Sequence, residues 1–140
     1  MIDLHVHTTA SDGTATPTEV IAEAKTIGLE AISITDHDTF AAYDEAVPAA
    51  REAGLQLIWG IEISTKLMQP GKPHGKTVHL LGYFMKGPTP EFLESIEEHQ
   101  RARHERNLQL CDRLKELGID VSIDEVKQLG RNMAGRPHFA

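Results

Sequence analysis

The feature that most constrains the fold is an alternation of strand-like and helix-like segments near the start of the chain. Three segments have strand character: residues 2–7, 31–35 and 55–63. Helix patterns that begin at Pro17 and near Phe40 separate them. Strands joined in this way by right-handed crossovers form a parallel sheet, and a fourth strand over residues 78–85 is expected in the same sheet. The ligand site of such a sheet lies beyond the carboxyl ends of its strands.

Cap residues indicate where the two early helices begin. Thr16 and Glu19 have the spacing of a capping box, which satisfies exposed N–H groups of the first helical turn. Asp38 or Thr39 is expected to cap the second helix, and Pro48 inside it predicts a kink or a late start.

The character of the sequence changes after residue 88. Residues 90–117 have the pattern of one long helix, but its middle part, residues 97–107, is almost wholly charged or polar. A segment that is polar on all sides does not pack in a core, so we expect it to project into solvent or to edge a cleft. Three arginines there could contact an anionic substrate, although neighbouring glutamates favour a solvated face: Arg101, Arg103 and Arg106.

Histidines and a carboxylate interrupt the apolar strand segments. His5 and His7 lie two residues apart, so both side chains point to one face of a strand and can reach the same metal ion. Alone, this pair could also be two ordinary histidines. Glu62 is embedded in an apolar run, where a carboxylate is hard to explain as solvent-facing. His79 is similarly placed, but alone it reads more readily as a core histidine with satisfied hydrogen bonds.

Acidic residues follow the first two strands. Asp12 comes after the first strand, although its glycine neighbour is also typical of a turn. Asp36, His37 and Asp38 end the second strand, where a parallel sheet places its site. Imidazole and carboxylate ligands suit manganese, iron or zinc, and the single cysteine excludes a structural zinc site made of thiolates. A carboxylate such as Glu62 can bridge two metals, which together can activate a water molecule and hold a phosphoryl oxygen.

Four segments in a fixed order carry this pattern. They are Asp3-Leu4-His5-Val6-His7-Thr8-Thr9-Ala10-Ser11-Asp12-Gly13, Ile34-Thr35-Asp36-His37-Asp38-Thr39, Gly60-Ile61-Glu62-Ile63-Ser64 and Val78-His79-Leu80-Leu81-Gly82-Tyr83. Together they resemble the PHP (polymerase and histidinol phosphatase) family. The resemblance is strongest to stand-alone phosphoesterases, which include nucleoside 3',5'-bisphosphate phosphatases and enzymes that degrade short RNA from the 5' end. The arginine-rich helix and the segment Gly135-Arg136-Pro137-His138 are also similar to that branch.

The resemblance implies an α/β fold that is the N-terminal part of a distorted (β/α)7 TIM-like PHP barrel with an inserted helical arm. It also implies two to three divalent metals, with manganese expected and zinc or iron as alternatives. The implied ligand sets are His5, His7 and Glu62 for one metal, Glu62 and His79 for a second, and Asp12 and His37 for a third.

The activity implied by the resemblance is hydrolysis of a phosphate ester by a metal-bridging hydroxide, with Glu62 at the catalytic centre. Arg136 is a candidate clamp for the substrate phosphate, because a guanidinium forks onto phosphate oxygens. His138 would donate to the phosphate or act as the acid for the leaving group. The alternative for both residues is a loop with solvated charges. The expected substrate is a small nucleotide or a short oligonucleotide.

The family pattern continues with a histidine before a proline and with an Asp-x-His motif, and neither is found in these 140 residues. We therefore expect a missing C-terminal segment or a second chain to complete the barrel, since an incomplete barrel has open sheet edges. The expected divisions are residues 1–88 for the N-terminal half of the barrel, 89–130 for the helical insertion and 131–140 for the return to the barrel.

Composition narrows the partners and the compartment. A net charge of -7 argues against a broad face for long nucleic acid, which would need clustered basic residues. One cysteine forms no internal disulfide, and the sequence contains no signal core and no apolar run of membrane-spanning length. We therefore expect a cytoplasmic protein with no membrane partner.

Three other functions are compatible with parts of the sequence. A histidinol-phosphate phosphatase is disfavoured by the long helix followed by Arg136-Pro137-His138. The exonuclease module of a polymerase is weakly disfavoured by the start at Met1 and the lack of a basic surface. A non-catalytic metal-binding remnant fits the absent C-terminal ligands, but the six retained ligand positions argue against it.

Overall fold

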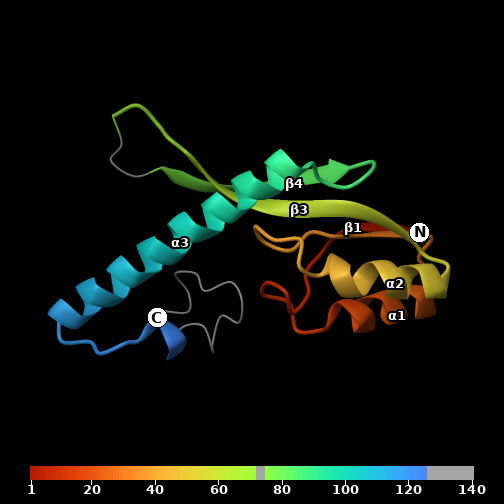
Figure 1. Ribbon diagram of the computed structural model, residues 1–140, viewed down its shortest axis with the longest axis horizontal. Coiled ribbons are helices and arrows are strands. Elements are labelled where there is room, and N and C mark those ends of the chain that lie inside the picture. Colours follow the sequence, from red (N-terminus) through yellow and green to blue (C-terminus); the bar gives the residue numbers. More distant parts are fainter. Residues whose placement is uncertain (72–74, 126–140) are drawn as a thin grey trace.

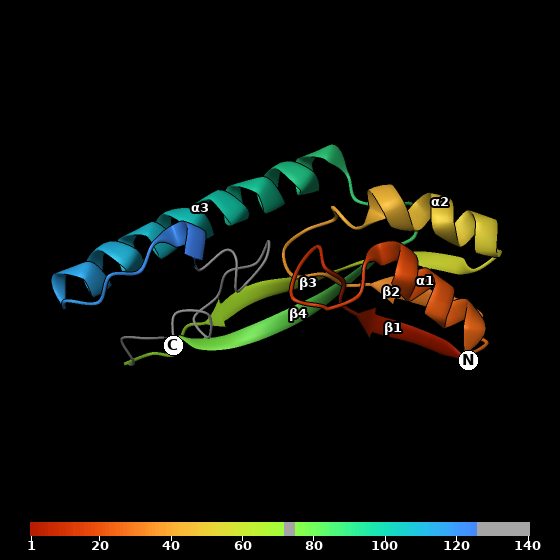
Figure 2. The same ribbon diagram turned by 90° about the horizontal axis from the view of Figure 1, so that it is seen from below.

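The computed structural model describes residues 1–71 and 75–125. In chain order, its elements are β1 (Ile2–Val6), α1 (Pro17–Thr26), β2 (Ala31–Ile34), α2 (Tyr43–Ala53), β3 (Gln56–Leu67), β4 (Lys76–Phe84) and α3 (Pro90–Glu116). α1, α2 and α3 lie on one side of a single sheet, with α1 and α2 next to each other (Figure 1 and Figure 2). Within the described ranges, every helix is too short or too polar to span a lipid bilayer.

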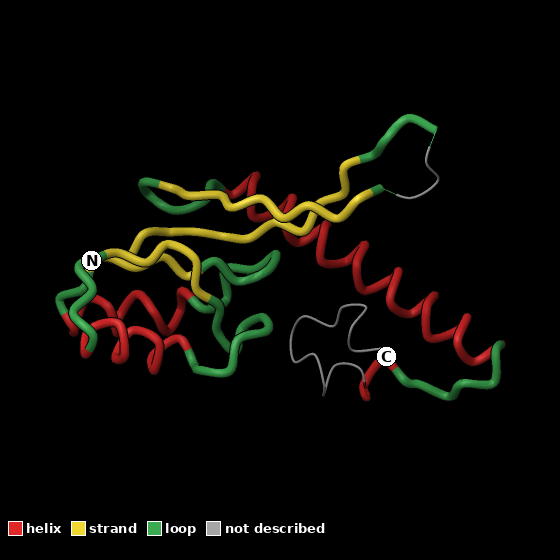
Figure 3. The backbone as a smooth tube through the Cα atoms, turned by 180° about the vertical axis from the view of Figure 1, so that it is seen from behind, coloured by secondary structure: helices red, strands yellow, loops and turns green. Residues whose placement is uncertain are grey.

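The sheet has the strand order β1-β2-β3-β4, and its first three strands are parallel. This confirms the α/β class expected from the alternation of strands and helices. β4 returns antiparallel to β3, with Leu67 opposite Lys76. The expected fourth strand is thus present in the same sheet. It runs antiparallel because the connection after β3 is shorter than the dozen or more residues that a parallel crossover needs. Figure 3 shows the β3–β4 hairpin reaching beyond the ends of the two shorter strands.

α1 begins as its sequence indicates. Thr16 Oγ1 accepts a hydrogen bond from Glu19 N at 3.2 Å, and a Glu19 carboxylate oxygen accepts one from Thr16 N at 2.7 Å, so the capping box is present. Behind this cap, α1 and α2 each bury an apolar face against the sheet. The buried core residues are Val20, Ile21, Ala24, Leu29, Ile32, Ile34, Ala42, Tyr43, Ala46, Ala50 and Leu55.

α2 begins at Tyr43 and contains Pro48, so the helix starts before the proline and the late start expected there is wrong. Its N-cap is Ala42, and no side chain closes the first turn. The prediction that Asp38 or Thr39 caps this helix is therefore wrong. The Asp38 carboxylate turns towards β3 instead, where it accepts a backbone hydrogen bond.

The ring of Tyr43 fixes α2 against the middle of β3. It stacks on Trp59 with 4.1 Å between ring centroids, and its hydroxyl oxygen accepts a hydrogen bond from Gly60 N at 2.6 Å. The same hydroxyl donates to Ile34 O at 2.7 Å. A Cβ atom at Gly60 would collide with the Ser33 side chain, so glycine is needed where β3 approaches β2. Burial raises the pKa of Tyr43 to about 12, so the hydroxyl keeps its proton at neutral pH.

α3 agrees closely with the long helix predicted over residues 90–117. Its first turn packs on the sheet, where the rings of Phe92 and Phe84 are 5.1 Å apart. Its other end extends beyond α1 and α2 (Figure 1).

The polar middle of α3 is only partly solvated. Gln100 Nε2 donates to Asp38 O at 2.6 Å, and Arg103 Nη1 donates to Asp38 Oδ2 at 2.8 Å. The expected solvated face is therefore wrong for Arg103, which pairs with a buried carboxylate. Arg101 fits the expectation, since it is exposed and has a long ion pair of 3.7 Å with Glu97 on the same helix.

Candidate metal centre

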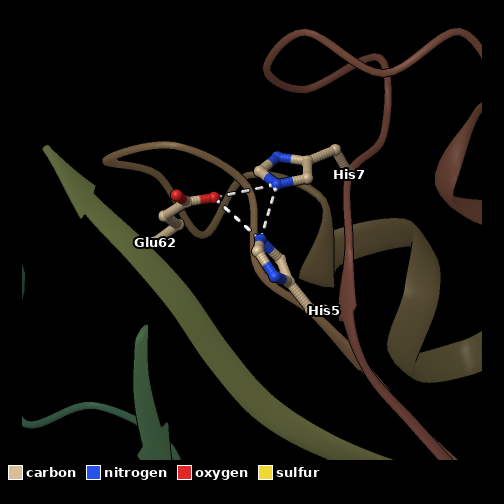
Figure 4. Close-up of side chains that lie close together, drawn as sticks. All are labelled: His5, His7 and Glu62. Carbon is tan, nitrogen blue, oxygen red and sulfur yellow. Dashed lines mark hydrogen bonds and ion pairs between the residues drawn. The ribbon is translucent and has the colours of Figure 1, made fainter. Parts of the chain in front are cut away.

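His5 and His7 point to the same face of the sheet, as alternation along β1 requires. Their Nε2 atoms are 3.2 Å apart. Both Nε2 atoms also face Oε2 of Glu62, at 3.0 Å from His5 and 2.9 Å from His7 (Figure 4). Glu62 comes from β3, so the third strand completes a group that the first strand begins. Three potential ligand atoms thus converge on one point.

The spacing of these three atoms fits a metal ion. Metal–ligand bonds of about 2.0–2.2 Å at tetrahedral or octahedral angles place neighbouring ligand atoms about 2.8–3.6 Å apart. The separations of 2.9, 3.0 and 3.2 Å fall in this range. Hydrogen bonds alone do not explain them, because the two Nε2 atoms carry at most two protons for three close pairs. A cation at this point would remove the mismatch.

The second oxygen of Glu62 faces another histidine. His79 Nδ1 lies 2.7 Å from Glu62 Oε1, and His37 Nδ1 lies 3.8 Å from Glu62 Oε2. His79 is opposite Ser64 within the β3–β4 pair, inside an apolar strand segment as the sequence indicates. Glu62 is therefore shared between two groups of imidazoles, which is the arrangement needed for a carboxylate that bridges two cations.

Asp12 completes a third group with His7 and His37. Asp12 Oδ1 lies 3.2 Å from His7 Nδ1, and Asp12 Oδ2 lies 3.6 Å from His37 Nε2. In each of the three groups, the ligand atoms lie within 4.8 Å of one another. The structure thus brings together all the residues that the sequence proposes as metal ligands: His5, His7, Asp12, His37, Glu62 and His79.

The electrostatics of the centre favour ionised Glu62 and neutral His37. Burial raises the pKa of Glu62, but hydrogen bonds with His5 and His79 and the nearby His37 and His7 outweigh this effect, so the pKa lies below its usual value. The pKa of His37 is also lowered, chiefly by burial. Neutral imidazole is the form that binds metals. His37 Nδ1 is buried and has no hydrogen-bond partner among the described residues, so it is available to a cation.

Asp36 holds the loop between β1 and α1, a role that the sequence pattern does not indicate. Asp36 is buried and accepts hydrogen bonds from Thr8 N at 2.7 Å, Thr8 Oγ1 at 2.6 Å and Ser11 Oγ at 2.5 Å. A Cβ atom at Gly13 would collide with the backbone carbonyl of His7, so glycine lets this loop fold back. The available signal was a second carboxylate directly after an apolar strand, beside the proposed ligand His37.

Asp38 is a second residue whose part in the site the sequence did not predict. It is fully buried and has a left-handed backbone with φ of 52°. Its carboxylate accepts hydrogen bonds from Ser64 N at 2.7 Å and Arg103 Nη1 at 2.8 Å. Arg103 lies 65 residues further along the chain, so no local pattern connects the pair.

The described centre consists of imidazoles and carboxylates, a set of donors that suits two or three divalent transition metals. The sequence also predicts Arg136 and His138 as ligands for a substrate phosphate. Both residues lie outside the described part of the chain.

Comparison with protein families and curated proteins gives consistent matches. The sequence profile described as the PHP domain matches residues 3–123. A 5'-3' exoribonuclease of Haemophilus influenzae is 36% identical over 138 residues, which cover 99% of this chain and 48% of the relative. A 3',5'-nucleoside bisphosphate phosphatase of Chromobacterium violaceum is 33% identical over 141 residues, which cover 99% of this chain and 47% of the relative.

Solved structures share the fold. A protein of Bifidobacterium adolescentis assigned as a metal-dependent phosphoesterase is 32% identical and has a TM-score of 0.76, over 98% of this chain and 47% of that one. An amidohydrolase of Chromobacterium violaceum with bound sulfate is also 32% identical, with a TM-score of 0.78 over 99% of this chain and 47% of that one. The chain spans about half the length of the curated relatives it matches.

Proposed function

The chain belongs to the PHP domain family, and we propose that the protein is a metal-dependent phosphoesterase whose centre is built around Glu62. The observation that carries this proposal is one buried carboxylate shared between two groups of imidazoles. Such a carboxylate can hold two cations side by side, and paired cations are suited to in-line displacement at phosphorus. The names of the relatives from Haemophilus influenzae and Chromobacterium violaceum, an exoribonuclease and a phosphatase, support phosphoester chemistry.

We assign the metal ligands in three sets. They are His5, His7 and Glu62 for one metal, Glu62 and His79 for a second, and Asp12 and His37 for a third. Manganese is the expected metal, with zinc or iron as alternatives, because all three accept mixed imidazole and carboxylate ligands. The sequence-based assignment of Arg136 and His138 to the substrate phosphate is kept as part of the proposal.

The chemistry divides between the cations and the side chains that hold them. When bound, divalent metals lower the pKa of water and polarise a phosphoryl oxygen. The Glu62 carboxylate stays ionised at neutral pH, because the histidines around it hold its pKa below the usual value. Asp12 Oδ1 lies 3.2 Å from His7 Nδ1. There it can accept a hydrogen bond from the ring N–H, which orients the opposite ring nitrogen, Nε2, towards the centre.

The proposed substrate is a small nucleotide or a short oligonucleotide. The relatives from Haemophilus influenzae and Chromobacterium violaceum are named for action on RNA and on nucleoside bisphosphates. The net charge of -7 favours a small substrate over long nucleic acid. We propose the cytoplasm as the compartment, because the only cysteine, Cys111, is free.

We also propose that further strands complete the barrel, either from the same protein or from a second chain. The relatives are about twice as long as this chain. Leu81 and Tyr83, on the face of β4 that carries His79, are 40% and 44% exposed in the described part of the molecule. Additional strands would cover this face.

The decisive experiment pairs metal content with turnover. The protein would be loaded with manganese and analysed by elemental mass spectrometry, and the release of phosphate from adenosine 3',5'-bisphosphate would be followed. We expect two or three metals per complete protein together with phosphate release. Glu62→Gln should lose both, while Glu23→Gln, an exposed glutamate on α1, should keep both.

Two results would contradict the proposal. Absence of bound metal after supplementation would remove the metal centre altogether. Metal binding without release of phosphate from mono- or bisphosphorylated nucleotides or short RNA would leave a non-catalytic metal-binding protein.

A further inference from the structure

The buried Asp38 carboxylate has an unusual position for a charge. It lies beyond β2, is fully buried, and is adjacent in sequence to the proposed metal ligand His37. A carboxylate taken out of water needs partners close to both oxygens. Ser64 N supplies one at 2.7 Å from Oδ1, and Arg103 Nη1 supplies the other at 2.8 Å from Oδ2.

The backbone around Asp38 joins two parts of the metal centre. Asp38 N donates to Glu62 O at 3.0 Å, and Glu62 N donates to Asp36 O at 3.3 Å. These bonds form an isolated parallel bridge between His37 and Glu62. The bond from Ser64 N to the Asp38 side chain extends the bridge by one step along β3. This short ladder therefore determines how far His37 stands from Glu62.

The helical arm meets the ladder at the same point. Arg103 Nη1 contacts Ser64 Oγ at 3.2 Å as well as Asp38, so one guanidinium spans both sides of the ladder. Gln100 Nε2 donates to the backbone carbonyl of Asp38 at 2.6 Å. His99 Nε2 is 3.6 Å from Asp38 Oδ1, and these three residues share little more than one turn of α3. The arm is thus fastened where the segment after β2 meets the middle of β3, at the two proposed ligands His37 and Glu62.

We propose that Arg103 is a positioning residue, which acts through Asp38 and Ser64 to hold His37 and Glu62 at the separation that a pair of metal ions requires. This inference rests on the proposed function. One guanidinium nitrogen, Nη1, contacts both acceptors. Arginine suits this partly buried position because its guanidinium stays charged, whereas a buried lysine shifts its pKa readily. In this role, Arg103 contacts neither metal nor substrate.

The test uses the complete protein and measures manganese affinity by isothermal titration calorimetry, together with kcat and KM for adenosine 3',5'-bisphosphate. Arg103→Gln removes the charge, and Arg103→Lys keeps a positive charge but replaces the guanidinium with an ammonium. The matched control is Arg113→Gln, since Arg113 is on the same helix, 69% exposed, and paired with Glu116 at 2.6 Å. We expect Arg103→Gln to weaken manganese binding by about tenfold or more, the usual effect of removing an outer partner of a metal ligand. Arg103→Lys should fall between this variant and the wild type, and the control should match the wild type.

A double-mutant cycle tests the route through Asp38. If Arg103 acts through that carboxylate, Arg103→Gln combined with Asp38→Asn should bind manganese no more weakly than Asp38→Asn alone. Additive losses in the double variant would overturn the proposed route. Circular dichroism identifies any variant that fails to fold, and Arg103→Lys then supplies the comparison with Arg113→Gln.

Other outcomes separate the two proposals. A raised KM with unchanged manganese affinity would mean that Arg103 contacts the substrate, and this inference would be wrong while the proposed function stood. Manganese affinity and kcat equal to those of the control would also overturn the inference alone. Failure of the wild-type protein to bind manganese would overturn the proposed function and this inference together.

Discussion

A backbone hydrogen bond joins Asp38 to Glu62. Both residues have buried carboxylates, but these carboxylates have very different partners. Asp38 is fully buried and meets a guanidinium from α3 and a backbone N–H. Glu62 is 6% exposed, and its ion pairs within the described residues are all with histidines. One charge is balanced by a permanent cation of the chain, while the other faces rings that can be neutral.

The difference separates a structural carboxylate from one suited to a ligand. A buried carboxylate with a fixed arginine partner has no need of an external ion. Imidazoles around Glu62 can give up their protons and offer lone pairs, so the same group can accept metal ions. The two regions should therefore respond differently to mutation and to removal of metal.

In the metal-free protein, the largest effect is expected at Asp38. Asp38→Ala leaves the Arg103 guanidinium without its carboxylate, so the free energy of unfolding should fall by about 2–4 kcal/mol. The lower part of this range applies because Arg103 is 21% exposed and can regain some water. Urea unfolding in a chelator should show this loss in full, because the pair of Asp38 with Arg103 exists without metal. A loss that vanishes in the chelator would contradict the comparison, and Asp112→Ala, on the exposed side of α3, is the control.

Glu62→Gln should behave in the opposite way. At a free metal concentration of about 100 times the dissociation constant, the wild-type protein gains about 2.7 kcal/mol of stability from binding. The variant should lose most of this gain, because the shared oxygen atoms of Glu62 are central to two ligand groups. In chelator, we expect the free energy of unfolding of the variant to be lower than that of the wild type by about 1 kcal/mol, the value of one hydrogen bond. Thermal unfolding with and without manganese measures both quantities.

Gly13→Ala tests the loop that carries Asp12. The added methyl group would collide with the His7 carbonyl, so we expect a loss of about 1–3 kcal/mol in unfolding free energy and weaker metal binding. Gly82→Ala is the matched control, because its Cβ would make only an ordinary contact with Ile61 at 3.4 Å. Urea unfolding and calorimetric titration with manganese would follow both variants. Equal effects at the two glycines would argue against a special role for the loop.

The smallest effect is a dependence of stability on pH in the metal-free protein. The pKa of Glu62 is lower in the folded protein than its usual value, because hydrogen bonds and neighbouring histidines outweigh burial. Its contribution to stability is therefore present above its unfolded pKa and is lost as the pH falls through the folded pKa. Unfolding in chelator between neutral pH and pH 3 should be slightly steeper for the wild type than for Glu62→Gln. Parallel curves would contradict the lowered pKa.

The sequence predicts the ligand group better than it predicts the support around it. His5, His7, Asp12 and His37 were predictable because parallel strands deliver their carboxyl ends to one edge of a sheet. His79 was predictable from its place within an apolar strand segment, and β4 presents it from within the strand. That β4 runs antiparallel does not change which face carries His79, because side chains alternate for either strand direction.

The pairing of Asp38 with Arg103 lay beyond sequence reasoning. The prediction of Asp38 as a helix cap followed a sound local rule, but a guanidinium 65 residues away and a backbone N–H of β3 compete for the same carboxylate. The composition of the arginine-rich helix, with glutamates beside its arginines, predicts a solvated face. Its docking depends on tertiary contacts that no helical periodicity encodes.

The stack of Tyr43 on Trp59 gives the molecule an internal optical probe. Trp59 is the only tryptophan of the chain, and it lies three positions before Glu62 on the same strand. Its indole is 4.1 Å from the Tyr43 ring, whose hydroxyl accepts a hydrogen bond from Gly60 N. Intrinsic fluorescence therefore reports on the strand that carries the shared carboxylate, without any label. A change in emission on addition of metal, with no change in secondary structure, would record an adjustment of β3 itself.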